Sequence, residues 1–127
     1  MNNIKTFENF NNQDIFKYIS NNDIKSVKNY INSKNDLNIQ KIDGDTALIY
    51  AASYNNRKMV ELLLDYYADE FILNDEDKSF YDYLDDENKQ YFTQKYPTSV
   101  YNAISHKYKK SFTEFVKDYN IKIKNSK

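Results

Sequence analysis

The sequence repeats its apolar pattern at a spacing of 33 residues. Val27 aligns with Val60 and Ile31 aligns with Leu64, with no insertion between the two copies. A fixed period of this length is typical of proteins built from stacked units. One such unit cannot bury its own apolar face, so the chain is predicted to fold as a stack. Further matches at this spacing are Asp36 with Asp69, Ile39 with Ile72, Thr46 with Ser79, Leu48 with Tyr81 and Met59 with Phe92.

Gly44 is the only glycine among the 127 residues. Glycine adopts a positive φ at no steric cost, so this position predicts a turn with an unusual backbone conformation. Asn11 and Asp77 occupy the matching positions one period earlier and one period later. Gly44 therefore sets the register of the repeat.

The second copy, residues 41–73, resembles an ankyrin repeat. Its stretch GDTALIYAA at residues 44–52 is similar to the family pattern G-x-T-P-L-H-x-A-A. The stretch MVELLL at residues 59–64 is similar to the family's I-V-x-x-L-L, and Ala68-Asp69 is similar to the Ala-Asp that follows the second helix. The resemblance implies a helix-turn-helix unit preceded by an extended finger.

The same copy departs from the family pattern at four positions. Ala47 stands in place of proline and Ile49 in place of histidine, while Asn55 and Tyr67 stand where the family has glycine. Asparagine tolerates the left-handed conformation that the glycine supplies. A tyrosine tolerates it poorly, so Tyr67 predicts strain or a remodelled loop.

Helix signals recur along the chain at the positions that such a stack requires. Thr46, Asp23 and Ser79 are predicted to cap helices, and Ser111 opens a capping box with Glu114. Apolar residues at i, i+3 and i+4 mark the buried faces. Pro97 is predicted to stop one helix, and Thr98 or Ser99 to start another that runs toward Lys107.

We therefore predict an all-α, ankyrin-like solenoid of about three to four helix-turn-helix units with short β-like fingers. The predicted repeat domain spans residues 13–120, with units at 13–40, 41–73 and 74–97 and a degenerate C-terminal cap at 98–120. Residues 1–12 form a leader that either packs as one helical turn or is disordered. Residues 121–127 are predicted to fray after a short strand-like alternation at residues 121–124.

The composition argues against an enzyme. The chain has no cysteine and one histidine, His106, and its single glycine cannot build a phosphate-binding loop. Asp75, Asp77 and Ser79 mimic the start of a calcium loop, but Phe80 occupies the place of the required glycine. We expect no catalytic residues, no cofactor and no metal. Without a signal-like segment or a membrane span, a cytoplasmic location is expected.

Charge is unevenly distributed along the sequence. Acidic residues dominate between Asp65 and Asn88, and lysines dominate after Asn88, although the formal net charge is only −1. Such an acidic region favours a partner protein with a basic surface. An acidic decoy that mimics nucleic acid is the alternative, while direct nucleic-acid binding is not expected.

The resemblance implies that the chain binds another protein through the fingers and the exposed side of the helices next to them. Carried onto this sequence, the predicted protein-binding residues are Ile42, Asp43, Asp45, Ser53, Tyr54, Asp75, Glu76, Lys78, Asp86 and Glu87. The function that follows is that of an adaptor or inhibitor, without catalysis.

Two further hypotheses concern assembly and origin. An uncovered aromatic edge would make the chain a weak homo-oligomer or a self-associating structural protein rather than a monomer. The leader residues 4–10 resemble the starts of small proteins of large tailed phages, which favours an inhibitor of a host protein. The residues of the predicted edge are Tyr91, Phe92, Tyr96 and Tyr101.

Overall fold

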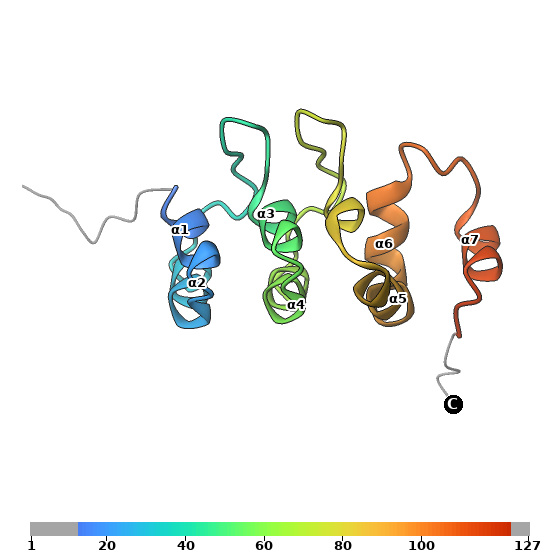
Figure 1. The fold of residues 1–127 in the computed structure, drawn as a ribbon, viewed down its shortest axis with the longest axis horizontal. Coiled ribbons are helices and arrows are strands. Elements are labelled where there is room, and N and C mark those ends of the chain that lie inside the picture. Colours follow the sequence, from blue (N-terminus) through green and yellow to red (C-terminus); the bar gives the residue numbers. More distant parts are fainter. Residues whose placement is uncertain (1–12, 123–127) are drawn as a thin grey trace, which may run out of the picture.

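Pairs of short helices follow one another along a line, and two fingers project from one side of the row (Figure 1). The computed structural model describes residues 13–122. Within that range the chain forms seven α-helices, one 3₁₀ helix and no strand, which confirms the predicted all-α stack. The elements are α1 Asp14–Ser20, α2 Ile24–Asn32, α3 Ala47–Ser53, α4 Arg57–Asp65, η2 Phe80–Tyr83, α5 Asp86–Lys95, α6 Pro97–Ile104 and α7 Phe112–Asp118.

The first two helix pairs follow from the sequence signals. The Asp23 side chain accepts the Ser26 N–H at 3.1 Å and opens α2, and Thr46 Oγ1 accepts the Ile49 N–H at 3.2 Å and opens α3. Ala51 and Ala52 are fully buried, and their small side chains let neighbouring helices approach α3 closely. In Figure 1, α2 and α4 lie on the side of α1 and α3 that faces away from the fingers.

Left-handed residues recur at the 33-residue spacing. Asn22 and Asn55 turn the chain between the two helices of each pair, with φ of 55° and 52°. Lys34 and Tyr67 follow the second helix of each pair, with φ of 62° and 68°. The prediction of left-handed backbone at Asn55 is confirmed. Of the two alternatives predicted at Tyr67, the loop is not remodelled, because Tyr67 keeps the left-handed turn geometry without glycine, and strain stays a prediction.

The third layer departs from the period. The expected helix after Ser79 is only the short 3₁₀ turn η2, closed by a capping box with Asp82. Asp85 caps α5 by accepting the Asn88 N–H at 2.8 Å. A new helix therefore begins at residue 86, which the 33-residue period would place at the end of the first helix of this layer. Asn88 itself lies inside α5, and its amide donates to Asn55 Oδ1 at 2.9 Å. The turn of the second layer is thus bonded to the helix of the third.

Pro97 starts a helix as well as following one. It occupies the first turn of α6, where a missing N–H costs nothing, so the prediction of a start at Thr98 or Ser99 was wrong by one or two residues. The helix ends at Ile104 and does not reach Lys107. The capping box at Ser111 is confirmed and opens α7. The predicted leader, residues 1–12, and residues 123–127 of the predicted tail lie outside the described part of the chain.

The predicted aromatic edge is not uncovered. Phe92 is fully buried, because α5 turns it into the core. The hydroxyls of Tyr91, Tyr96 and Tyr101 donate to Glu61, Asp65 and the Lys110 carbonyl, and all three rings are half-buried. These tyrosines tie neighbouring segments together, and the proposed self-association edge was wrong in this respect.

Replacing Tyr67 with glycine is expected to stabilise the fold. The φ of Tyr67 is 68°, a conformation that costs a non-glycine residue about 1–2 kcal/mol. Glycine removes this cost, but it also makes the unfolded chain more flexible, which offsets part of the gain in stability. Tyr67→Gly should therefore raise the free energy of unfolding by about 1 kcal/mol, measured by urea denaturation. An unchanged or lower urea midpoint would show that the loop is unstrained.

Asp82 makes the stability depend on pH in the acid range. Burial raises the pKa of Asp82, but hydrogen bonds from Lys107 Nζ and the Ser79 N–H outweigh it and leave the pKa below its usual value. A lowered folded-state pKa gives stability that is present above the unfolded pKa of about 3.9 and is lost as the pH falls through the folded value. Asp82→Asn should therefore show a smaller fall in urea midpoint between pH 7 and pH 3 than the parent chain, and parallel falls would contradict this assignment.

Candidate protein-binding surface

The two fingers are built alike, 33 residues apart. In the first finger the Lys41 N–H donates to the Asp45 carbonyl at 2.8 Å, and in the second the Asn74 N–H donates to the Lys78 carbonyl at 3.0 Å. The fingers are joined by the Asp75 N–H, which donates to the Asp43 carbonyl at 3.1 Å. The pair therefore forms one platform along the edge of the stack.

Gly44 is needed at the contact between the fingers. Its φ is 90°, and a Cβ placed there would lie 2.7 Å from the Asp75 nitrogen and 3.1 Å from the Asn74 carbonyl carbon. Both neighbours are backbone atoms, which cannot move aside as a side chain can. The glycine thus allows close approach of the second finger as well as the turn.

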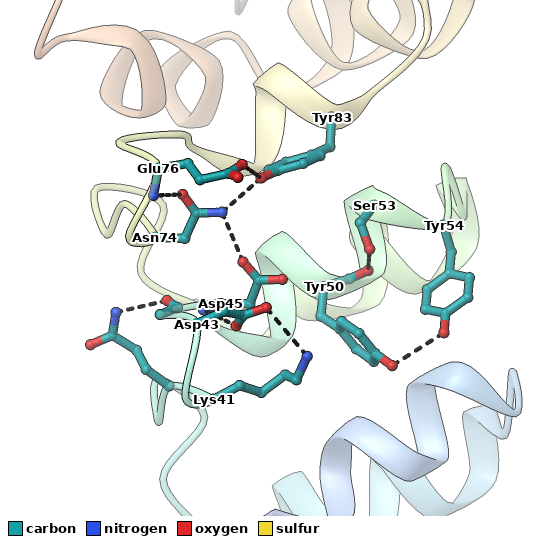
Figure 2. A network of polar contacts seen from close by, with 11 residues as sticks. Lys41, Asp43, Asp45, Tyr50, Ser53, Tyr54, Asn74, Glu76 and Tyr83 are labelled. Atoms are coloured by element: carbon teal, nitrogen blue, oxygen red, sulfur yellow. Dashed lines mark hydrogen bonds and ion pairs between the residues drawn. The ribbon is translucent and has the colours of Figure 1, made fainter.

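A buried polar network fixes the second finger to the helices (Figure 2). The Asn74 amide donates to Asp45 Oδ1 and to the Tyr83 hydroxyl oxygen, each at 2.8 Å, while Asn74 Oδ1 accepts the N–H groups of Glu76 and Lys78. Burial raises the pKa of Asp45. The Tyr83 hydroxyl donates onward to Glu76 Oε1 at 3.2 Å. Every polar atom of Asn74 that can bond is therefore engaged.

A pair of tyrosines lies on α3 beside this platform. The hydroxyls of Tyr50 and Tyr54 are 3.1 Å apart, and their rings meet edge to face with centroids 5.2 Å apart (Figure 2). Lys41 Nζ lies 4.5 Å from the centroid of the Tyr50 ring, and Phe16 of α1 packs against the same ring. The Tyr50–Tyr54 pair is thus held in place by neighbours on three segments.

Most of the predicted binding residues share this surface. Ile42 is fully exposed at the tip of the first finger and Tyr54 is 52% exposed on α3. Asp43 lies at the fingertip with Lys41 Nζ 3.6 Å from its Oδ2, and the hydrogen bond from the Asp45 N–H keeps the pKa of Asp43 below its usual value. The other exposed members are Ser53 on α3 and Asp75, Glu76 and Lys78 on the second finger.

Three predicted residues do not join the surface. Asp45 is only 8% exposed and points into the network of Asn74, so it supports the fingers from within. Asp86 and Glu87 lie in the first turn of α5, because the third layer lacks a full first helix. Glu87 faces Arg57 of α4 at 3.8 Å, and Asp86 lines a groove of about 390 Å³ that also includes Tyr119.

Sequence reasoning missed three residues of this surface. Lys41 and Tyr50 make the cation–ring contact, and Tyr83 closes the network below the second finger. A signal for two of them was present, since Tyr50 and Tyr83 are both tyrosines at the 33-residue spacing. The exposed fingers carry Asp43, Asp75, Glu76 and Asp77 against Lys41 and Lys78, so the platform is acidic.

Across residues 13–122, no three histidine, aspartate or glutamate side chains converge as metal ligands. No helix in the same range is long and apolar enough to cross a membrane.

Comparison with known proteins places the repeat in a family. The sequence matches the family pattern described as ankyrin repeats in three copies over residues 15–125. No curated protein matches the sequence. Among solved structures, the fold is similar to a chain from the complex of the predatory endopeptidase Bd0816 of Bdellovibrio bacteriovorus with the immunity protein Bd3460, with a TM-score of 0.49 and 19% identity. That likeness covers 86% of this chain and 47% of the other, so the present chain spans about half its length. Because the family pattern covers most of the sequence, this chain belongs to the ankyrin repeat family.

Proposed function

We propose that this chain is a non-catalytic binding module that acts by occupying the surface of a partner protein. The observation that carries the proposal is the Tyr50–Tyr54 pair held beside an acidic platform of two bonded fingers. Stacked repeats form extended surfaces of this kind, which bind proteins without a catalytic centre. We infer an intracellular adaptor or inhibitor, and an inhibitor of a host protein if the chain comes from a virus.

The chemistry of the platform favours a partner with a basic, partly apolar surface. Tyrosine supplies a rigid ring with a polar tip at low entropic cost, and such residues often dominate binding energy. Ile42 adds an exposed apolar contact at the fingertip. The finger carboxylates would raise the association rate and exclude acidic proteins more than they add affinity.

The acidic-decoy alternative receives less support. A decoy needs a row of free carboxylates, whereas several acidic side chains between residues 65 and 88 are engaged inside the fold. Asp65 accepts from the Tyr96 hydroxyl, Glu70 from the Asn102 amide, and Asp82 from Lys107 Nζ. These three carboxylates accept hydrogen bonds within the fold and are therefore not free to mimic phosphates. Protein binding remains the proposed function.

The test is a comparison of variants as bait in extracts of the native cell or host. The double variant Ile42→Ala, Tyr54→Ala removes the exposed apolar contacts, and the double variant Lys28→Ala, Lys58→Ala alters exposed positions of α2 and α4. A partner captured by the parent chain should bind the first variant at least about tenfold more weakly and the second one equally. Equal binding to all three would refute the assignment of this surface.

A further inference from the structure

A second surface lies where α4 ends and the chain climbs toward the second finger. It is a groove of about 550 Å³, which we call the α4-end groove. Its walls come from three segments far apart in the sequence, and none belongs to α3 or to a fingertip. The lining residues are Asn38, Leu64, Tyr67, Ala68, Asp69, Glu70, Phe71 and Ser99.

Aromatic side chains are exposed at this groove to an unusual degree. Tyr67 is 90% exposed and Phe71 is 57% exposed, and Tyr66 beside them is 43% exposed. They are three of the five large hydrophobic residues that are exposed among residues 13–122. Clustered exposure of apolar side chains marks interaction surfaces, whereas scattered exposure does not.

Tyr67 also holds its ring outward on a strained backbone. Its φ is 68°, a conformation that costs a bulky residue about 1–2 kcal/mol. Within residues 13–122, the Tyr67 ring makes no aromatic contact and its hydroxyl makes no hydrogen bond that would offset this cost. The backbone bonds of the turn hold this conformation, with the Tyr67 N–H donating to the Leu64 carbonyl and the Ala68 N–H to the Leu63 carbonyl, each at 3.0 Å. Strained backbone positions of this kind cluster at binding sites.

The charge of the groove is one-sided. Asp69 and Glu70 line it, and no lysine or arginine is among its lining residues. Asp69 Oδ1 accepts the Phe71 N–H at 2.9 Å and Glu70 Oε2 accepts the Asn102 amide at 2.7 Å. Both side chains are therefore oriented by neutral donors, and no lysine or arginine among residues 13–122 forms an ion pair with either carboxylate.

We propose that the α4-end groove binds an extended, arginine-bearing segment of a partner protein. Two carboxylates and two exposed ring faces together fit a guanidinium, which pairs with carboxylates in its plane and stacks on rings with its face. A lysine ammonium gains less from such a site, because it is a compact, strongly hydrated charge without the planar fork and flat face of a guanidinium. The open shape of the groove suits a linear segment rather than a folded domain.

The test uses a capped seven-residue peptide with two arginines flanked by leucine, serine and glycine, and its counterpart with two lysines. Titration into the ¹⁵N-labelled chain should shift amide resonances of residues 64–71. The arginine peptide should bind at least about fivefold more tightly than the lysine peptide. Shifts confined to the fingers, or equal affinity for both peptides, would overturn the proposal.

Tyr67→Gly is an informative variant because it is expected to fold better and bind worse. The arginine peptide should lose at least about fivefold in affinity, and a loss in a more stable protein cannot come from unfolding. Lys34→Gly changes the equivalent left-handed position one unit earlier and should leave affinity unchanged or slightly higher. Glu70→Gln keeps an oxygen for Asn102 and should weaken binding about threefold.

Two further outcomes would overturn the proposal. Tyr54→Ala should bind the arginine peptide as the parent chain does, and a loss there would place the peptide on the finger surface instead. A chain that dimerises without peptide, and reverts to a monomer in Tyr67→Gly, would show that a second copy occupies the groove. Sedimentation of the parent chain and of Tyr67→Gly at high concentration, without peptide, tests for this dimer.

Discussion

Gly44→Ala should destabilise the fold by about 3 kcal/mol. An L-residue at φ of 90° is strained, and its Cβ would stand 2.7 Å from the Asp75 nitrogen. That nitrogen makes the hydrogen bond to the Asp43 carbonyl that joins the two fingers. The methyl group must push the second finger away, so turn geometry and finger contact are lost together. Urea denaturation followed by circular dichroism measures the effect.

Asp77→Ala is the matched control for this change. Asp77 holds the equivalent position in the second finger, with φ of 60°, and it is exposed. No glycine is removed there, so the free energy of unfolding should change by less than about 1 kcal/mol. If Gly44→Ala lies within the same range as Asp77→Ala, the close approach of the fingers is not a source of stability.

The architecture could be predicted because its signals are local and repeated. The helix caps at Asp23 and Thr46 and the capping box at Ser111 each depend on residues three positions apart, and each is present in the structure. The left-handed residues follow the 33-residue period from Asn22 to Asn55. The local capping signals and the 33-residue period agree, and for this reason the stack could be predicted from one sequence.

The third layer could not be predicted because competing local signals decide it. The period places a turn at residue 88, but Asp85 is a strong cap and starts α5 three residues earlier. Asn88 then serves as a bonding partner for Asn55 instead of turning the chain. For this reason Asp86 and Glu87, placed by the period at a helix end, lie at a helix start.

The positions of the candidate binding residues in the fold were predicted only in part, for a related reason. Exposed fingertip residues such as Ile42 follow from the repeat pattern alone. The burial of Asp45 depends on Asn74, which lies 29 residues later in the chain. A contact between two side chains of neighbouring units leaves no periodic trace, since neither residue recurs at the matching position. For this reason Asp45 was predicted to be an exposed, partner-binding residue.

Asn74→Ala is the second change with a large expected effect. Its amide is the donor that Asp45 Oδ1 has in the interior, and its oxygen accepts the Glu76 and Lys78 N–H groups. Removing these partners leaves a buried carboxylate and two backbone donors unsatisfied, which should cost about 3 kcal/mol at pH 7. Asn29→Ala, an exposed position of α2, should change the free energy of unfolding by less than about 0.5 kcal/mol.

The pH dependence of the Asn74→Ala effect identifies its cause. Burial already raises the pKa of Asp45, and loss of the amide donor should raise it further. A raised folded-state pKa favours the protonated form, so the deficit should be largest at neutral pH and shrink as the pH falls toward 4. A deficit that is the same at pH 7 and pH 4.5 would mean that Asn74 acts through its backbone acceptor bonds alone. Asn74→Ala would also remove the hydrogen bonds that Asn74 makes with the Glu76 N–H and the Tyr83 hydroxyl. Partner binding through the fingers should therefore weaken in parallel with the free energy of unfolding.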